Sequence, residues 1–283
     1  MNFLNTIQQR YMSMSPVEKR IADCILEDPE MMTKSTVIYI AKKAGVSQGS
    51  VTNFAISLGA SGFSQLKINI AQNLPASTSP SNTGEKNKVM HKMLESAKIS
   101  FETTLDSLAE EDFKAAAEML LNADRIIVVG FAHSAPVALD IATRLLSIGL
   151  PAQVINDALT ANVACARLNE KGVLLAISHS GRTRDSLACA KTAKNVKAGV
   201  IGFTSYSVTP LSEISDITFV AVSNETQNYR ESMTARLTQL IIGDCLVEYI
   251  AQKIGNDAVE RQDSTAEIFE SNREKLLFDY ISD

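Results

Sequence analysis

In the first 74 residues, apolar positions recur at the three- and four-residue spacing of amphipathic helices. Ser15, which precedes Pro16 and lies three residues before Glu18, is typical of a helix start with a capping box. The apolar face that follows consists of Val17, Ile21, Cys24 and Ile25. Asp28-Pro29 is expected to end this helix. Every element predicted in this part of the chain is helical.

A helix–turn–helix pattern follows directly. The sequence predicts a short amphipathic helix over residues 36–43 and a tight turn at Ala44-Gly45-Val46. Ser47 is then the expected cap of a third helix that runs to about Leu58, where Gly59 ends it. The first part of the chain is therefore predicted to be an all-α domain.

The pattern of apolar positions changes in the second part of the chain. After a predicted helix over residues 86–108, short apolar and β-branched segments at 125–129, 153–155, 173–178, 199–203 and 217–222 alternate with helical segments. This alternation predicts an α/β domain in three layers, a parallel five-stranded sheet covered on both faces. Ligands of such sheets bind at the carboxyl ends of the strands, which draws attention to the loops after Val129 and Ile177.

Between these two parts lies PASTSPSNTGEKN, which has no apolar periodicity and many turn-forming residues. Such a composition is typical of an exposed linker. We therefore expect a helix-turn-helix domain over residues 1–74, a linker over 75–87 and an α/β domain with flanking helices over 88–283, with its core at 124–253.

Composition and charge narrow the classes of protein. Hydrophobic residues make up 45% and charged residues 21%, as in an ordinary soluble protein. No apolar run approaches the roughly 20 residues that cross a bilayer, and the N-terminus lacks the pattern of a secretory signal, so we expect no membrane contact and a cytoplasmic location. The net charge is −5, but residues 1–74 carry 7 Lys and Arg against 5 Asp and Glu, which favours nucleic-acid contact through that end only.

The four cysteines are widely separated and form no CxxC pair or Cys/His cluster. This spacing favours buried free thiols over a disulfide framework or a zinc site. The expected buried thiols are Cys24, Cys165, Cys189 and Cys245.

The loop SHSGRT follows a predicted buried strand and precedes a predicted helix. Ser178, Ser180 and Thr183 offer hydroxyls, and Gly181 permits an unusual backbone turn. The helix start adds unpaired N–H groups and the positive end of a dipole, a combination suited to a dianionic phosphate. An ordinary strand-to-helix turn with Ser and Thr caps is the alternative.

A second hydroxyl points to the same edge of the sheet. The first predicted strand ends at Gly130, and Ser134 lies just before a helix expected to begin near Pro136. GFAHS alone is also compatible with simple turn chemistry. The two loops together favour a phosphate site.

GFAHS, SHSGRT and TSYSVTPL resemble the sugar isomerase (SIS) domain, whose members bind phosphosugars. The resemblance implies that Ser134, Ser178, Ser180 and Thr183 bind ligand phosphate and nearby hydroxyls. It places Glu225 near the sugar, and we interpret His133 and His179 as ligand-contacting or loop residues. Two departures stand out: Ala132 replaces a common glycine, and Leu159 lies where several relatives have histidine.

The segment IAKKAGVSQGSVTNFAISLGASGFSQLK resembles the N-terminal helix-turn-helix of RpiR/MurR-type transcriptional regulators, which join this unit to an SIS domain. The third helix is then expected in the DNA major groove. The candidate contacts to phosphates or base edges are Lys42, Lys43, Ser47, Gln48, Ser50, Thr52, Asn53 and Lys67. A structural three-helix unit with a solvated polar face is the alternative.

The third helix departs from many relatives, which have Arg at the place of Asn53 and further basic residues near Ile56. Neutralisation of phosphates supplies most nonspecific affinity for DNA. We therefore expect modest, salt-sensitive binding that depends on dimerisation or avidity.

These observations favour a regulator that senses a phosphorylated sugar, such as an amino-sugar phosphate, and controls sugar catabolism genes. We expect no catalytic residue, no cofactor and no metal, a homodimer or tetramer, and a palindromic operator as the DNA partner. The alternative is an aldose-ketose isomerase, which needs a base and an acid, roles suited to Glu225 and a histidine. A purely structural protein would leave both hydroxyl loops without a role.

Overall fold

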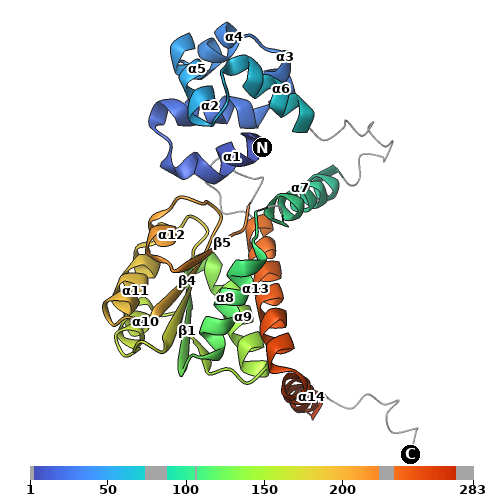
Figure 1. The fold of residues 1–283 in the computed structure, drawn as a ribbon. Helices are drawn as coiled ribbons and strands as arrows, with labels where there is room; N and C mark the ends of the chain where they lie inside the picture. The colour runs from blue at the N-terminus through green and yellow to red at the C-terminus, as the bar shows by residue number, and fades with distance from the viewer. Residues whose placement is uncertain (1–2, 74–87, 106, 223–232, 272–283) are drawn as a thin grey trace, which may run out of the picture.

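The computed structural model describes residues 3–73, 88–105, 107–222 and 233–271. Figure 1 shows a helical unit built from the N-terminal residues above an α/β domain. We call the helical unit, residues 3–73, the head. The proposed linker at 75–87 lies outside the described residues.

The head consists of short helices around its own core. Ser15 caps the second helix, with Glu18 completing the predicted capping box. Asp28 ends that helix, as predicted. It also caps a further helix that was not predicted from the sequence, because its side chain accepts a hydrogen bond from Met31 N. The helices are α1 (Phe3–Arg10), α2 (Pro16–Glu27), α3 (Pro29–Lys34), α4 (Val37–Ala44), α5 (Gln48–Ser57) and α6 (Phe63–Asn73), with a 3-10 turn η1 (Tyr11–Ser13) after α1.

The predicted helix–turn–helix is formed by α4 and α5. Gly45 ends α4 in the left-handed region with φ 65°, a conformation that glycine adopts without a steric penalty. Ser47 then caps α5 through its side chain, which accepts a hydrogen bond from Ser50 N. Val51, Phe54 and Ala55 point into the core of the head, so the opposite face of α5 is left to the outside.

The second domain contains a parallel five-stranded sheet, as the alternating pattern predicts. Its strand order is β2-β1-β3-β4-β5, and every neighbouring pair is parallel. The strands are β1 (Arg125–Gly130), β2 (Ala152–Val154), β3 (Gly172–Ile177), β4 (Gly199–Thr204) and β5 (Ile217–Val220). Each lies within two residues of its predicted bounds.

Helices cover both faces of this sheet, which gives the predicted three layers. Alternate residues of β1 enter opposite cores: Ile126 and Val128 pack in one cluster, and Ile127 and Val129 in the other. The first core contains α8 (Glu110–Leu121), α9 (Ala135–Ser147) and α13 (Met233–Ile254), and the second contains α10 (Ala158–Cys165), α11 (Arg184–Asn195) and α12 (Pro210–Ile214).

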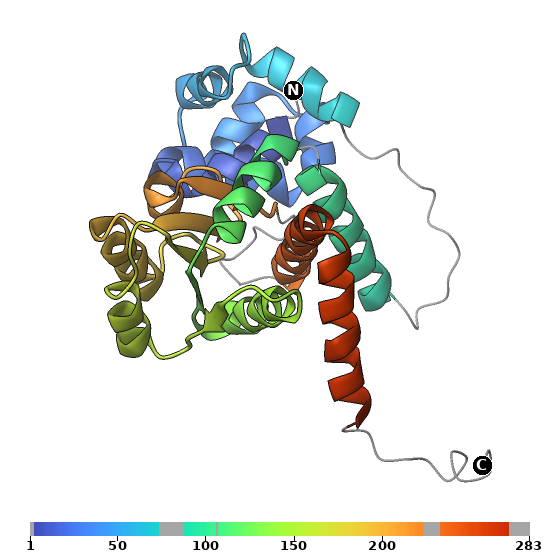
Figure 2. The same ribbon diagram turned by 60° about the horizontal axis from the view of Figure 1, so that its bottom comes forward.

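Two further helices flank the α/β domain. Helix α7 (Lys88–Leu105) packs on α13, and α14 (Asn256–Ser271) continues the chain beyond it. Figure 2 shows α7 and α14 on the outside of the domain, beside α13. Among the described residues, no helix combines the length and apolar character needed to cross a membrane.

The prediction for the cysteines is correct at three positions and wrong at one. Cys24, Cys165 and Cys189 are buried free thiols, but Cys245 is an exposed one. The apolar residues of α13 cover more than one side of the helix, so sequence alone did not distinguish the face that packs on the sheet. Cys245 lies beside Asp244 on the outer face, and burial still raises the pKa of its partly covered thiol.

Candidate functional site

The two loops with candidate hydroxyls begin side by side. Gly130 at the end of β1 is paired with Ile177 at the end of β3, so the loops that follow leave neighbouring strands at the carboxyl edge of the sheet. A Cβ on Gly130 would lie 2.5 Å from Ser134 O, so only glycine lets the first loop turn back this closely. The strand order therefore brings Ser134 and the SHSGRT loop to one edge, as expected.

Residues 178–183, which we call the phosphate loop, form a compact turn. Ser178 and Thr183 share a hydrogen bond between their hydroxyl oxygens, 3.0 Å apart, and Ser180 Oγ accepts from Arg182 N at 3.2 Å. Gly181 has φ 62°, which supports the prediction that this position needs glycine. The loop thus gathers three hydroxyls into one turn.

The phosphate loop leads directly into α11. Thr183 occupies the N-cap position, yet its side chain makes no capping hydrogen bond to the helix and instead contacts Ser178. The start of α11 therefore lacks a side-chain cap from Thr183, and free backbone N–H groups at a helix start can bind an anion. The geometry is compatible with phosphate binding by this loop.

The loop after β1 differs from the simple predicted turn. Residues Ala132–Ser134 form a 3-10 turn before α9, and Ser134 is buried without a capping hydrogen bond. Ala132, the residue that replaces a common glycine, has φ 51°. A non-glycine residue in the left-handed region is strained, so the departure in sequence is matched by a strained backbone.

A third loop supports the phosphate loop from the side of β4. We call residues 205–209 the β4–α12 loop. Ser205 N donates to His179 O at 2.9 Å, and Leu211 N at the start of α12 donates to Gly181 O at 3.0 Å. The side chain of Thr209 lies against Gly181, where a Cβ would meet it. The sequence pointed to this segment only through the resemblance of TSYSVTPL.

The histidines differ in their surroundings. His179 Nδ1 and Ser205 Oγ are 2.8 Å apart, and the His179 ring meets Tyr206 edge-on with centroids 5.7 Å apart. His133 is exposed beside Ser134, and His91 is exposed on α7. A ligand contact of His133 or His179 stays a prediction.

Two further positions concern contacts to the sugar ring rather than to its phosphate. Glu225 lies outside the described residues, so its expected place near the sugar stays a prediction. Leu159, at the position where several relatives have histidine, is 81% exposed on α10. The described residues therefore support the part of the site expected to bind phosphate.

The predicted DNA contacts gather on the outer face of α5 and its N-terminus. Gln48 and Asn53 are exposed, whereas Ser50 and Thr52 are half-buried. Ser47 and Ser50 bond to each other through their hydroxyls, and Thr52 Oγ1 donates to Gln48 O. Ile56, which is not among the predicted DNA contacts, is 53% exposed one turn after Thr52. Apolar side chains on such a face contact thymine methyl groups.

The three candidate lysines are not equivalent. The Lys42 side chain is exposed and makes no hydrogen bond or ion pair to any described residue. Lys43 pairs with Glu27 at 2.7 Å, and this hydrogen bond raises the pKa of Lys43. Lys67 Nζ donates to Ser35 O at 2.7 Å, a contact inside the head that competes with any bond to a DNA phosphate.

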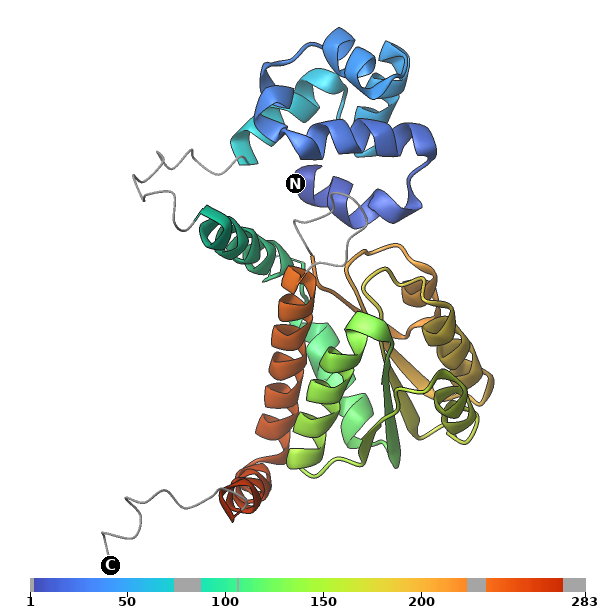
Figure 3. The same cartoon turned by 180° about the vertical axis from the view of Figure 1, so that it is seen from behind.

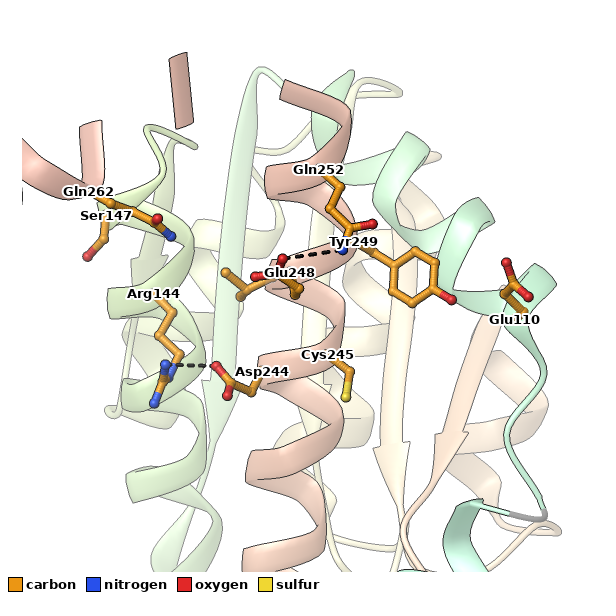
Figure 4. Close-up of a pocket in the computed structure, with 10 residues that line it drawn as sticks. Glu110, Arg144, Ser147, Asp244, Cys245, Glu248, Tyr249, Gln252 and Gln262 are labelled. Carbon is orange, nitrogen blue, oxygen red and sulfur yellow. Dashed lines mark hydrogen bonds and ion pairs between the residues drawn. The ribbon is translucent and has the colours of Figure 1, made fainter. Parts of the chain in front are cut away.

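A groove elsewhere on the α/β domain is distinct from this edge. It has a volume of about 680 Å³ and lies between α8, α9, α13 and α14 (Figure 4). Its Arg144 donates to Asp140 at 2.8 Å and to Asp244 at 2.7 Å, and Glu110 and Glu248 add further negative charge. Because its arginine is neutralised by two carboxylates, the groove is poorly suited to a phosphate.

Comparison with known proteins connects both halves of the chain to one family. Residues 1–77 match the helix-turn-helix domain of the rpiR family, and residues 119–249 match the SIS domain. An uncharacterized HTH-type transcriptional regulator of Caldanaerobacter subterraneus subsp. tengcongensis is 31% identical over 270 residues, which cover 94% of this chain and 96% of that protein. The chain belongs to the RpiR family of transcriptional regulators.

Two other proteins extend the comparison. The HTH-type transcriptional regulator HexR of Escherichia coli is 29% identical over 251 residues, covering 87% of this chain and 86% of HexR. The structure of the Vibrio vulnificus NanR protein complexed with ManNAc-6P has a TM-score of 0.63 at 23% identity, over 96% of this chain and all of that one. The helical head and the SIS fold predicted from the sequence are thereby confirmed.

Proposed function

We propose that this RpiR-family regulator binds a phosphorylated sugar through the hydroxyls at the carboxyl edge of its sheet. Binding of the sugar then changes its affinity for operator DNA. One observation carries the proposal. A single chain joins a helix-turn-helix unit to a turn in which Ser178 and Thr183 share a hydrogen bond at the uncapped start of α11. Hydroxyls and a helix N-terminus together favour a dianionic phosphate.

The proposal also names the residues that contact the effector and the class of sugar phosphate to test first. Ser134, Ser178, Ser180 and Thr183 contact the phosphate and nearby sugar hydroxyls in this proposal, with His133, His179 and Glu225 as further ligand contacts. The NanR structure holds an N-acetylated amino-sugar 6-phosphate, which makes amino-sugar phosphates the first class to test. The loop recognises phosphate, so the ring must be identified by experiment.

Sensing without turnover is favoured over aldose-ketose isomerisation. Isomerisation needs a positioned acid and base beside the carbonyl. His179 directs Nδ1 at Ser205, in the supporting loop, and His133 is exposed. HexR and the Caldanaerobacter relative are named as transcriptional regulators, which also favours sensing. A protein that binds chromosomal DNA works in the cytoplasm, and we place it there.

Operator binding through α5 requires more than one copy of the chain. Lys42 is the candidate cation that the head leaves unengaged, so each head neutralises few phosphates. Two heads on a palindromic operator multiply a weak contact. Apolar side chains exposed on α7 and α14 supply a surface for a homodimer or tetramer, and they are Met90, Met93, Leu94, Val259, Ile268 and Phe269.

The test combines binding, turnover and DNA affinity. Purified protein is mixed with a panel of hexose 6-phosphates and N-acetylhexosamine 6-phosphates, including ManNAc-6P, while thermal melting and sugar NMR spectra are recorded. The proposal predicts a rise in melting temperature for at least one sugar phosphate, with its spectrum unchanged. It also predicts that this compound changes the gel shift of a duplex enriched from a random-sequence library. Conversion of an aldose into a ketose would support the isomerase instead.

A further inference from the structure

The β4–α12 loop, residues 205–209, contacts the phosphate loop on one side. Ser205 is tied to His179 twice, by Ser205 N to His179 O at 2.9 Å and by the 2.8 Å contact between His179 Nδ1 and Ser205 Oγ. Tyr206 meets the ring of the same histidine. Since His179 lies between Ser178 and Ser180, these contacts connect the two serines to this loop.

On its other side the same loop enters the head. Tyr206 is buried and belongs to the hydrophobic cluster formed otherwise by residues of the head. Ser207 N donates a hydrogen bond to Gln9 O at 3.2 Å, and Ser207 Oγ lies 3.4 Å from the same oxygen. Figures 1 and 3 show α1, which contains Gln9, lying directly over this end of the α/β domain.

Helix α1 in turn contacts the recognition helix. Arg10 Nη1 donates to Ser57 O, the carbonyl of the last residue of α5, at 3.0 Å. At the other end of α1, Phe3 N donates to Asn69 Oδ1 on α6. A continuous series of contacts therefore joins the phosphate loop to α5 through the folded parts of the chain.

We propose that the β4–α12 loop is the element that couples the sugar site to DNA binding, with Tyr206 as its anchor in the head. This inference rests on the proposed function and adds the route by which the effector acts. Closure of the phosphate loop on a phosphate shifts His179, hence Ser205 and Tyr206, and changes how α1 is seated. Because packed interfaces change between discrete arrangements, a small shift at Tyr206 repositions the end of α5.

Such coupling needs a differential affinity of the effector for two seatings of the head. The contacts that couple the two parts here are the buried ring of Tyr206 and the hydrogen bonds from Ser207 N and Oγ to Gln9 O. Couplings of this kind change affinity by about 5- to 150-fold. The route does not involve the segment at 75–87, which joins the two domains in sequence.

The test uses the full chain with Tyr206→Ala and, as a matched control, Val208→Ala. Val208 is an exposed apolar residue of the same loop and has no place in the cluster of the head. Operator affinity is measured by fluorescence anisotropy with and without the sugar phosphate that stabilises the wild type most in the panel. Sugar phosphate affinity is measured by calorimetry.

For Tyr206→Ala we expect operator and sugar phosphate each to bind within about threefold of wild type, while their coupling falls below about twofold. Val208→Ala should keep the wild-type coupling. If Tyr206→Ala lowers the melting temperature too far for binding assays, Arg10→Ala breaks the same route at Ser57 and must reduce the coupling.

The outcomes separate this inference from the proposed function. A wild type in which no sugar phosphate of the panel changes operator affinity contradicts the proposed function, and the inference with it. A wild type that couples, beside a Tyr206→Ala variant that couples equally well, overturns the inference alone. Loss of coupling in Val208→Ala to the same degree would also overturn it, because the effect would then not depend on the contact with the head.

Discussion

The proposed sugar-binding edge and the proposed DNA-binding face of this protein are built in opposite ways. At the edge, loops from neighbouring parallel strands are bound to one another, and Ser178 and Ser134 are buried. On α5, Gln48 and Asn53 are exposed on a single short helix, and of the candidate lysines beside it Lys43 is paired. A preorganised site recognises its ligand in one copy, whereas the open face gains affinity through repetition.

The preorganised edge is most sensitive to the backbone of the phosphate loop. In Gly181→Ala, the new Cβ would lie 2.5 Å from Thr209 Cβ, at a backbone φ of 62°. Strain of about 1–3 kcal/mol is expected there, enough to displace the loop. We predict a loss of about 5- to 150-fold in sugar phosphate affinity by calorimetry, with operator affinity kept. Unchanged affinity would contradict the assigned geometry.

The next effect concerns one hydroxyl of the same loop. Ser180→Ala removes a hydroxyl proposed to bind the phosphate and keeps the glycine turn. A hydrogen bond to a charged group contributes about 1.5–3 kcal/mol, so sugar phosphate affinity should fall about 10- to 100-fold. Ser147→Ala, at the far end of α9, serves as the control. A Ser180→Ala variant that responds at the wild-type ligand concentration would show that this serine does not bind the effector.

How much of this edge followed from the sequence depends on what the pattern encodes. Strand–helix alternation and the residues Gly130, Ser134 and Gly181 predicted the parallel sheet, the paired loops and the special turn. The strained φ of Ala132 and the hydrogen bond between the hydroxyls of Ser178 and Thr183 depend on three-dimensional closure. The inner and outer faces of α13 also required the structure, because apolar residues lie on several of its sides.

On the open face, Asn53 is the polar side chain best placed to pair with a base. Asn53→Ala should cost about 1–3 kcal/mol of operator binding, which is roughly 5- to 100-fold in affinity, if Asn53 forms a bidentate contact with adenine. The thermal shift with sugar phosphate should not change. If Asn53→Ala binds the selected duplex with wild-type affinity, Asn53 does not recognise a base.

A smaller difference should separate two adjacent lysines. Lys42→Ala removes a cation without a partner, whereas Lys43→Ala removes one already paired with Glu27. We predict that Lys42→Ala reduces the slope of log affinity against log salt by about 1, and that Lys43→Ala changes it less. Anisotropy titrations between low and moderate salt measure both slopes. A larger effect of Lys43→Ala would contradict the assignment of the lysines.

The smallest predicted effect concerns Ala132, in the loop after β1 at the proposed sugar-binding edge. Ala132 has φ 51°, so Ala132→Gly relieves a steric penalty of about 1 kcal/mol. We expect an increase of roughly 2–4 °C in the melting temperature. Ala135→Gly is the matched control, because Ala135 has φ −61° at the start of α9 and glycine there should destabilise the protein. A lower melting temperature for Ala132→Gly would mean that Ala132 is not strained.

The contacts of the head show which features could be predicted from the sequence and which could not. Ser47 and the turn at Gly45 predicted α4 and α5 because capping and left-handed glycine are local rules. The bonds of Lys67 to Ser35 and of Arg10 to Ser57 join residues 32 and 47 positions apart. The hydrogen bond of Ser207 to Gln9 joins residues 198 positions apart. Such contacts follow from packing, which periodicity and motif spacing do not describe.

The central claim is that sugar phosphate binding and DNA binding are coupled in one molecule. Thermodynamic linkage tests it most directly: operator affinity is measured with and without saturating sugar phosphate, and sugar phosphate affinity with and without operator. We predict that both affinities change by one common factor of about 5 to 150. An operator affinity that stays constant at saturating sugar phosphate would contradict the account.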